Sequence, residues 1–189
     1  MKPYERLPET VTYNGKRYRL DMSYVAFFAV SELMQDKSLL DYVKVSGALE
    51  ILVKGRHPVD PGLLTAIYDL IKEERPRTGT DQKLMDIGQD WHYICAAFQQ
   101  AYGINLYRDR KMHILRFRAL LQALPKDTRM SEIVGIRAAK IPAPTKYNRE
   151  QIAELTRLKA QYALRGSEES LQDGFAKLFA LLEARAKNV

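Results

Sequence analysis

The sequence predicts a mainly α protein with one short β-hairpin near its N-terminus. Three observations predict this class: apolar residues recur at spacings of three and four over most of residues 23–187, an Asn-Gly pair separates two short segments, and Gly55, Gly103 and Pro125 end periodic runs. The chain has 189 residues, of which 46% are hydrophobic and 28% charged. A chain of this length and composition can bury an apolar core without disulfides.

The first predicted element is the hairpin. Residues 10–13 and 16–20 are short segments suited to strands, and Asn14 and Gly15 between them favour the two positive φ angles of a type I′ turn. Because two strands alone are marginal in water, we expect the hairpin to lie on helices or to pair with another chain.

Three helices are predicted in the first half of the chain, over residues 23–35, 38–54 and 61–74. Ser23 is a suitable N-cap for the first helix, and Gly55 suits the end of the second. Asp60 followed by Pro61 is typical of a helix start. Residues 75–83 are almost without apolar side chains and are predicted to form a loop.

Five helices are predicted in the second half, over residues 91–102, 109–124, 131–140, 148–164 and 170–187. The first two end at Gly103 and Pro125 and are expected to form a helical hairpin. Ser131 opens the third. Asn148, with Gln151 three residues later, resembles a capping box at the start of the fourth.

Two prolines in residues 141–145 predict a hinge. We therefore divide the chain into a helical domain with the hairpin, residues 1–142, and a C-terminal helical appendage, residues 143–189. A terminal helix beyond a hinge has less core available to cover its apolar stripe, which is therefore a candidate partner-binding face. The stripe consists of Leu171, Phe175, Leu178 and Leu182.

The chain lacks the residue combinations that catalysis or metal binding needs. Cys95 is the single cysteine, so disulfides and cysteine-based zinc sites are excluded, and it lies in an apolar helical stripe typical of an inert thiol. The three histidines, His57, His92 and His113, are far apart in sequence. We expect no enzyme activity and no cofactor. The N-terminus has no apolar signal region and no long apolar run exists, so we expect a cytoplasmic protein.

Positive charge is concentrated in the second half of the chain. Residues 1–90 contain 13 Lys and Arg against 14 Asp and Glu, whereas residues 91–189 contain 17 against 9. The helix predicted over 109–124 carries a candidate partner-binding set: Arg110, Lys111, His113, Arg116, Phe117 and Arg118. Such charges attract acidic proteins or nucleic acid, and they are also typical of solvated helix surfaces. For His113, a place in the core or at its boundary is the alternative to a functional role.

Two segments resemble the bacteriophage gene-product-fifteen family. Residues 85–106 read MDIGQDWHYICAAFQQAYGINL, and the family shares the Ala-Ala-Phe helix and the Tyr-Gly-Ile-Asp/Asn-Leu exit. Residues 113–121 read HILRFRALL, where family members carry two aromatic residues in place of Ile114 and Leu115. The stretch from Leu124 to Pro142 and the strand at 15–20 are also similar.

The resemblance implies a role in phage tail morphogenesis. A protein of this family is expected to act as a non-enzymatic tail assembly chaperone that binds the tape-measure protein or another tail protein, with self-association, in the cytoplasm of a bacterial host. The competing hypothesis is a basic phage protein that binds nucleic acid. Neither hypothesis involves a membrane.

Overall fold

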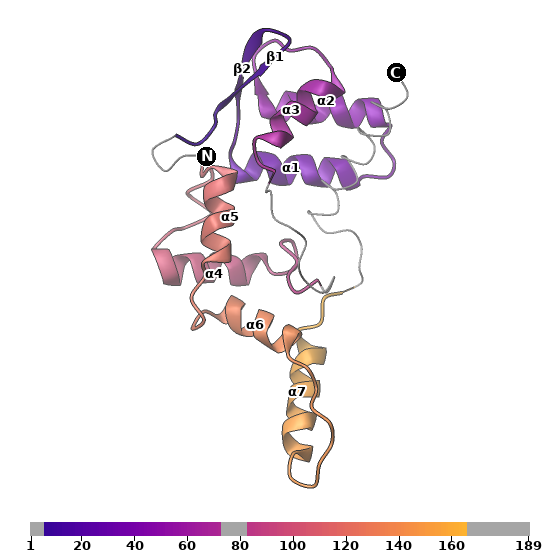
Figure 1. Ribbon diagram of the computed structural model, residues 1–189, viewed down its shortest axis with the longest axis vertical. Coiled ribbons are helices and arrows are strands. Elements are labelled where there is room, and N and C mark those ends of the chain that lie inside the picture. Colours follow the sequence, from indigo (N-terminus) through magenta and orange to yellow (C-terminus); the bar gives the residue numbers. More distant parts are fainter. Residues whose placement is uncertain (1–5, 73–82, 166–189) are drawn as a thin grey trace. The chain divides into compact units, whose positions relative to one another are not determined.

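The computed structural model describes residues 6–72 and 83–165, and it confirms the mainly α class (Figure 1). These residues form seven helices and a three-stranded antiparallel sheet, and about 51% of them are helical. The chain divides into two compact units. Within the described residues, unit 1 consists of 6–72 and 109–119, and unit 2 consists of 83–108 and 120–165.

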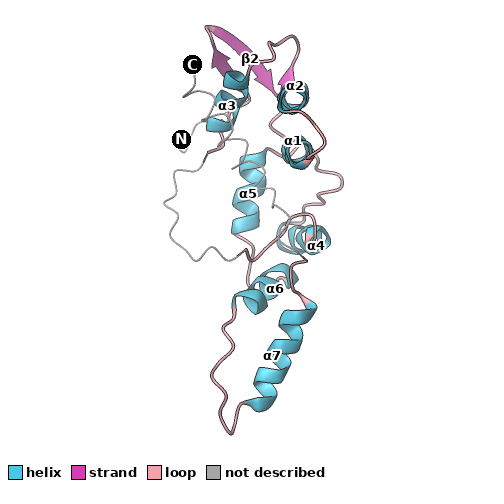
Figure 2. Ribbon diagram, turned by 90° about the vertical axis from the view of Figure 1, so that its right-hand side faces the viewer, coloured by secondary structure: helices cyan, strands magenta, loops and turns pink. Residues whose placement is uncertain are grey.

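The predicted hairpin is present in unit 1 as β1 (Thr10–Tyr13) and β2 (Lys16–Leu20), shown as magenta arrows in Figure 2. Asn14 and Gly15 have φ angles of 48° and 73°, as a type I′ turn requires. A third strand, β3 (Val53–Lys54), pairs with β2. The helix predicted to run to residue 54 is therefore too long, because the backbone at Val53 is extended and pairs with β2.

Helices α1 (Tyr24–Gln35) and α2 (Asp41–Leu52) pack against each other in unit 1. The Ser23 hydroxyl accepts a hydrogen bond from Ala26 N at 3.3 Å, so the predicted cap of α1 is confirmed. A Cβ at Gly47 of α2 would lie only 2.8 Å from Leu33 Cδ2. The absence of a side chain at Gly47 thus permits this close approach of the helices.

Helix α3 (Pro61–Asp69) begins at the predicted Asp60 cap, where Oδ1 accepts from Gly62 N at 2.8 Å. The other carboxylate oxygen, Oδ2, accepts from the Tyr13 hydroxyl at 2.8 Å. One aspartate therefore caps the helix and connects it to the hairpin. The helix ends before the predicted residue 74, and residues 73–82, which include most of the predicted loop, lie outside the described residues.

Helix α5 (Ile114–Gln122) begins later than the predicted start near Asp109. Ser23 and His113 form an antiparallel bridge, in which Tyr24 N donates to Met112 O at 2.9 Å and Ile114 N donates to Met22 O at 2.7 Å. This pairing holds the backbone before Ile114 out of the helix. The boundary between the two units falls within α5, after residue 119.

In unit 2, α4 (Trp91–Tyr102) packs chiefly on α6 (Arg129–Ala138). The Tyr102 hydroxyl of α4 also donates to Leu120 O, near the end of α5, at 2.9 Å, and the predicted helical hairpin of these two helices stays a prediction. Gly103 ends α4 as predicted, in the left-handed conformation with a φ angle of 65°. The cap of α6 is Thr128, whose Oγ1 accepts from Ser131 N at 3.3 Å, and not Ser131 itself.

Helix α7 (Arg149–Gln161) follows Asn148 as predicted and packs on α6, and none of its residues is buried. Asn148 does not form the expected capping box. Its Oδ1 accepts from Thr145 N at 2.7 Å, and its Nδ2 donates to Ala143 O at 2.9 Å. The side chain thus fixes the connection that precedes the helix.

The division of the chain at residues 142 and 143 stays a prediction. Residues 166–189, which hold the last predicted helix, lie outside the described residues. None of the helices in the described parts of the chain has the length and apolar character needed to span a bilayer.

Candidate functional site

The predicted site residue Phe117 lies in an aromatic cluster inside unit 1. Its ring stacks on Tyr24 at a centroid distance of 4.8 Å and meets Phe28 edge-on at 5.4 Å. Phe117 is 0% exposed and Tyr24 is 2% exposed. The Phe117 ring therefore packs within its own chain, and rings in this arrangement stabilise a core beyond the area they bury.

His113 acts as a cap for helix α5. Leu115 N donates to its Nδ1 at 3.1 Å, and Phe117 N donates to its backbone oxygen at 2.9 Å. Since Nδ1 accepts, the ring proton lies on Nε2, which donates to Pro8 O at 2.9 Å. One ring nitrogen therefore caps the helix start, and the other connects it to the N-terminal segment. This agrees with the alternative interpretation of a boundary histidine.

The basic residues of the predicted set divide into two groups. Arg118 is half-buried, and its Nη1 donates to Ile71 O at 2.7 Å, just beyond α3. Arg110, Lys111 and Arg116 are exposed. Three of the predicted residues, His113, Phe117 and Arg118, therefore form contacts within unit 1. The other three, Arg110, Lys111 and Arg116, are cations at the surface.

The other predicted set, Leu171, Phe175, Leu178 and Leu182, lies outside the described residues. As a candidate partner-binding face it stays a prediction.

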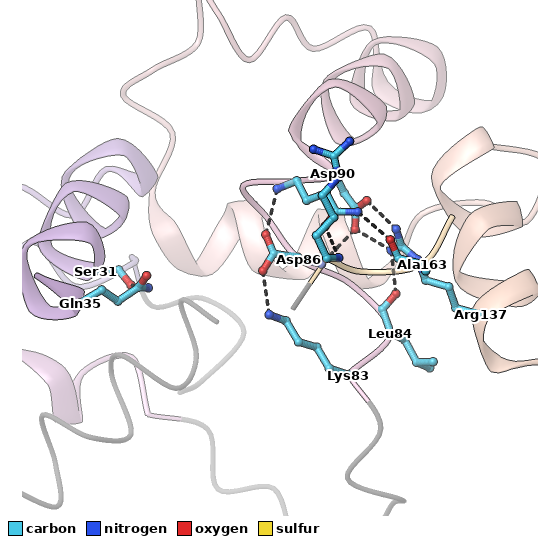
Figure 3. Close-up of polar contacts among 10 residues, drawn as sticks. Ser31, Gln35, Lys83, Leu84, Asp86, Asp90, Arg137 and Ala163 are labelled. Carbon is cyan, nitrogen blue, oxygen red and sulfur yellow. Dashed lines mark hydrogen bonds and ion pairs between the residues drawn. The ribbon is translucent and has the colours of Figure 1, made fainter. Parts of the chain in front are cut away.

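The main polar cluster of unit 2 is centred on a buried ion pair, Arg137 with Asp90 (Figure 3). Two parallel contacts join them: Nη1 to Oδ2 at 2.7 Å and Nη2 to Oδ1 at 2.9 Å. Arg137 is 7% exposed and Asp90 is 1% exposed. The guanidinium also donates to Tyr162 O at 2.6 Å and Leu84 O at 3.0 Å. Arg137 thus connects α6 to the start of α4, the chain before it and the end of α7.

Lys83, Asp86 and Gln89 extend this cluster, and we call Arg137, Asp90 and these three residues the Arg137 clasp. Asp86 accepts from Lys83 Nζ at 2.7 Å and from Gln89 N at 2.9 Å. Burial opposes ionisation of Asp86, but these hydrogen bonds outweigh it, so the pKa of Asp86 is lowered. The Gln89 side chain donates to Ala163 O and accepts from Arg165 N. The clasp therefore holds the residues that follow α7.

The contacts of the clasp suit a role in stabilising the fold and not a role in catalysis. Both oxygens of Asp90 and three guanidinium nitrogens of Arg137 are used by neighbouring groups, so neither side chain is open to a substrate. This pair was not predicted from the sequence. One signal was present: Met130 and Ile133 are the inward residues of α6, and Arg137 continues their helical spacing. A charged residue in a core position indicates a buried partner.

Cys95 is buried on α4, and burial raises the pKa of its thiol, although the hydroxyl of Tyr107 partly offsets this. A thiol of this kind is a weak nucleophile at neutral pH. In residues 6–72 and 83–165, no three side chains among His, Cys, Asp and Glu gather in a way that would hold a metal ion.

The exposed apolar side chains of the described residues include two sets that were not predicted from the sequence. In unit 1, Leu40, Tyr42 and Val43 at the start of α2 are 76%, 67% and 43% exposed. In unit 2, Ile141 and Tyr147 in the connection between α6 and α7 are 50% and 91% exposed. Where exposed apolar side chains gather into a patch, they mark surfaces that bind other proteins.

We call residues 139–165 the arm. It consists of the connection 139–148, α7 and the residues that follow. Figure 1 shows the connection running along α7 before the chain turns back into the helix. The arm contains two acidic residues, Glu150 and Glu154, and six basic residues, which are Lys140, Lys146, Arg149, Arg157, Lys159 and Arg165. Its net charge is therefore +4 (six minus two).

One comparison with known proteins gives a match. The family model described as "Bacteriophage Gp15 protein" matches residues 4–164, which is most of the chain. No curated protein and no solved structure matches it significantly.

Proposed function

The chain belongs to the bacteriophage Gp15 protein family, and from this premise we propose that it is a non-enzymatic tail assembly chaperone. In this role it binds the phage tape-measure protein, or another tail protein, in the cytoplasm of the bacterial host. It leaves its partner chemically unchanged.

The observation that carries the proposal is the combination of family membership with exposed apolar side chains beside positive charge. A chaperone of a long amphipathic helix needs accessible apolar surface that its own core does not cover. Tyr42 and Tyr147 supply such surface, and the arm adds basic residues. The candidate catalytic groups support a role without catalysis: Cys95 is buried, and both ring nitrogens of His113 form hydrogen bonds within unit 1.

The test is co-expression with overlapping fragments of the tape-measure protein encoded by the same phage. We expect at least one fragment to co-purify and to remain in solution only when the chain is present. Light scattering then gives the size of the complex and of the chain alone, which tests self-association. Aggregation of every fragment regardless of the chain would contradict the proposal.

Nucleic acid is the second candidate partner, favoured by the net charge of +8 over residues 91–189. The two candidates differ in salt dependence. Binding to phosphates weakens by orders of magnitude between about 50 and 200 mM salt, whereas capture of an apolar helix changes far less. A fluorescence titration of a DNA duplex and of the captured fragment across this range separates them.

A further inference from the structure

The arm is the part of the described chain in which a whole helix contributes no buried residue. Ile152, Leu155 and Leu158 lie on one side of α7 at a spacing of three, and all three are only half-buried. The first buried residue of the arm is Tyr162, after the helix has ended. Among the described residues, packing therefore covers only part of the apolar surface of α7.

The arm is also held in a fixed shape. At its tip, Asn148 bonds to Thr145 N and Ala143 O. At its other end, Arg137 Nε donates to Tyr162 O, Lys159 Nζ donates to Arg137 O at 2.7 Å, and Gln89 bonds to the chain after Tyr162. A surface that is ordered before binding loses less conformational entropy when a partner docks. Polar anchors at both ends thus present the apolar side chains between them.

Charge and exposure at the tip indicate what the partner carries. Tyr147 is 91% exposed and lies between Lys146 and Arg149, both of which are exposed. Aromatic residues flanked by cations are typical of binding hot spots, and opposite charge on the partner raises the association rate. With a net charge of +4, the arm repels a second copy of itself and attracts an acidic surface.

The distribution of charges along α7 favours a protein over nucleic acid. Glu150 and Glu154 are interspersed with the cations, and Glu154 pairs with Arg157 at 2.7 Å. A phosphate backbone would meet these carboxylates along the helix, whereas a protein partner can match both signs and cover the leucines. Helix α7 has 13 residues, so it offers a partner helix about 20 Å of contact.

We infer that the arm is a docking surface for an amphipathic helix whose apolar stripe is flanked by acidic residues. This inference rests on the proposed function, since it specifies the surface and the partner chemistry of the chaperone.

The test uses the full chain and two kinds of probe. The first is a synthetic amphipathic helix with glutamates beside its leucine stripe, compared with the same helix carrying lysines. The second is the set of tape-measure fragments. Two variants change the tip: Lys146→Glu combined with Arg149→Glu, and Tyr147→Ala. Their matched controls outside the arm are Lys37→Glu combined with Arg56→Glu, and Tyr107→Ala, which change two exposed cations and an exposed tyrosine.

We expect the glutamate helix to bind at least about 10-fold more tightly than the lysine helix. The double charge reversal should weaken binding about 10-fold, and Tyr147→Ala about 3-fold to 10-fold, while both controls stay within about 2-fold. Circular dichroism melts should be equal for all variants, because every changed side chain is exposed.

Several outcomes would overturn the inference. Equal binding of the two synthetic helices would show that acidic residues on the partner do not contribute to binding. Equal losses of affinity in the control variants would show that the arm is not the binding surface. Arm-dependent binding of a DNA duplex with steep salt dependence would assign the surface to nucleic acid. A change of oligomeric state in Tyr147→Ala without a change in peptide affinity would assign it to a second copy.

The fragments separate this inference from the proposed function. If fragments bind equally to wild type and to the tip variants, the chaperone role stands and the arm is the wrong surface. If no fragment binds but the glutamate helix binds through the arm, the chaperone role fails and the docking surface stands.

Discussion

Helices α5 and α7 look alike as sequences, since each combines apolar residues at helical spacing with several basic ones, but the protein uses them differently. In α5, Phe117 is fully buried against Tyr24, and Arg118 bonds to the chain beyond α3. In α7, no residue is buried, and Arg157 pairs only locally with Glu154. The difference in burial depends on which side chains from other segments pack against each helix.

This contrast shows that an amphipathic pattern identifies a surface to be covered but not what covers it. The aromatic rings of α1 supply a partner for α5 within the chain. For α7 the main anchors are polar groups near its C-terminal end, and its leucines, Leu155 and Leu158, stay half-buried. Surface charge and partly exposed apolar side chains therefore occur together on α7.

The largest expected effect comes from removing one apolar side chain from each helix. Phe117→Ala should lower the free energy of unfolding by about 3 to 5 kcal/mol, because it leaves a cavity in the aromatic cluster. Leu155→Ala should cost below about 1 kcal/mol, because that residue is half-buried. Urea denaturation of both variants measures the difference. Similar losses would mean that α7 is covered as well as α5.

The next effect concerns the clasp that holds α7. Asp90→Asn should cost about 3 kcal/mol, because it leaves the buried guanidinium of Arg137 without its counter-charge. The control is Glu154→Gln, which makes the same change in an exposed pair and should cost below about 1 kcal/mol. Hydrogen exchange should also show lost protection at the end of α7 in Asp90→Asn. Unchanged protection there would contradict the anchoring role.

A smaller effect should separate two arginines. Arg118→Ala should cost about 1 to 2 kcal/mol, since Ile71 O loses a charged donor in a partly buried position. Arg157→Ala, in a side chain that is 66% exposed, should change stability by about 0.5 kcal/mol or less. Thermal melts of the two variants test this. Equal shifts would weaken the distinction between the helices.

The smallest effect is a dependence on pH. The pKa of Asp86 is lower in the folded protein than the ordinary value of about 3.9 in the unfolded chain. Its contribution to stability is therefore present above about pH 4 and is lost as the pH falls through the folded pKa. Asp86→Asn should flatten the acid limb of a plot of stability against pH. An unchanged limb would show that Lys83 and Gln89 contribute little.

Local features of the fold were predictable because they depend on neighbouring residues. Asn14 and Gly15 determine their own turn, Gly103 ends α4, and Asp60 caps α3. Features that depend on distant partners were not predictable. Val53 is in a strand because it pairs with Leu20 of β2. Helix α5 begins only at Ile114 because His113 pairs with Ser23.

The candidate site shows the same limit. Phe117 and Arg118 were chosen from a pattern that a core helix and an exposed helix share, and only the position of Tyr24 and Ile71 distinguishes the two. The pairing of Arg137 with Asp90 joins residues far apart in sequence, so spacing within one helix could only hint at it. Tyr147 lies in a connection without periodicity, where apolar patterns give no signal.

The packing of Phe117 from α5 on the rings of α1 also has a consequence for synthesis on the ribosome. Unit 1 is interrupted by residues 83–108 of unit 2, so its aromatic cluster cannot close until Phe117 has left the exit tunnel. Until then, the rings of Tyr24 and Phe28 lack the residue that covers them. Pairings between distant segments slow folding and leave apolar surface open to aggregation in the meantime. A nascent chain that stalls before residue 117 should therefore expose these rings to host chaperones.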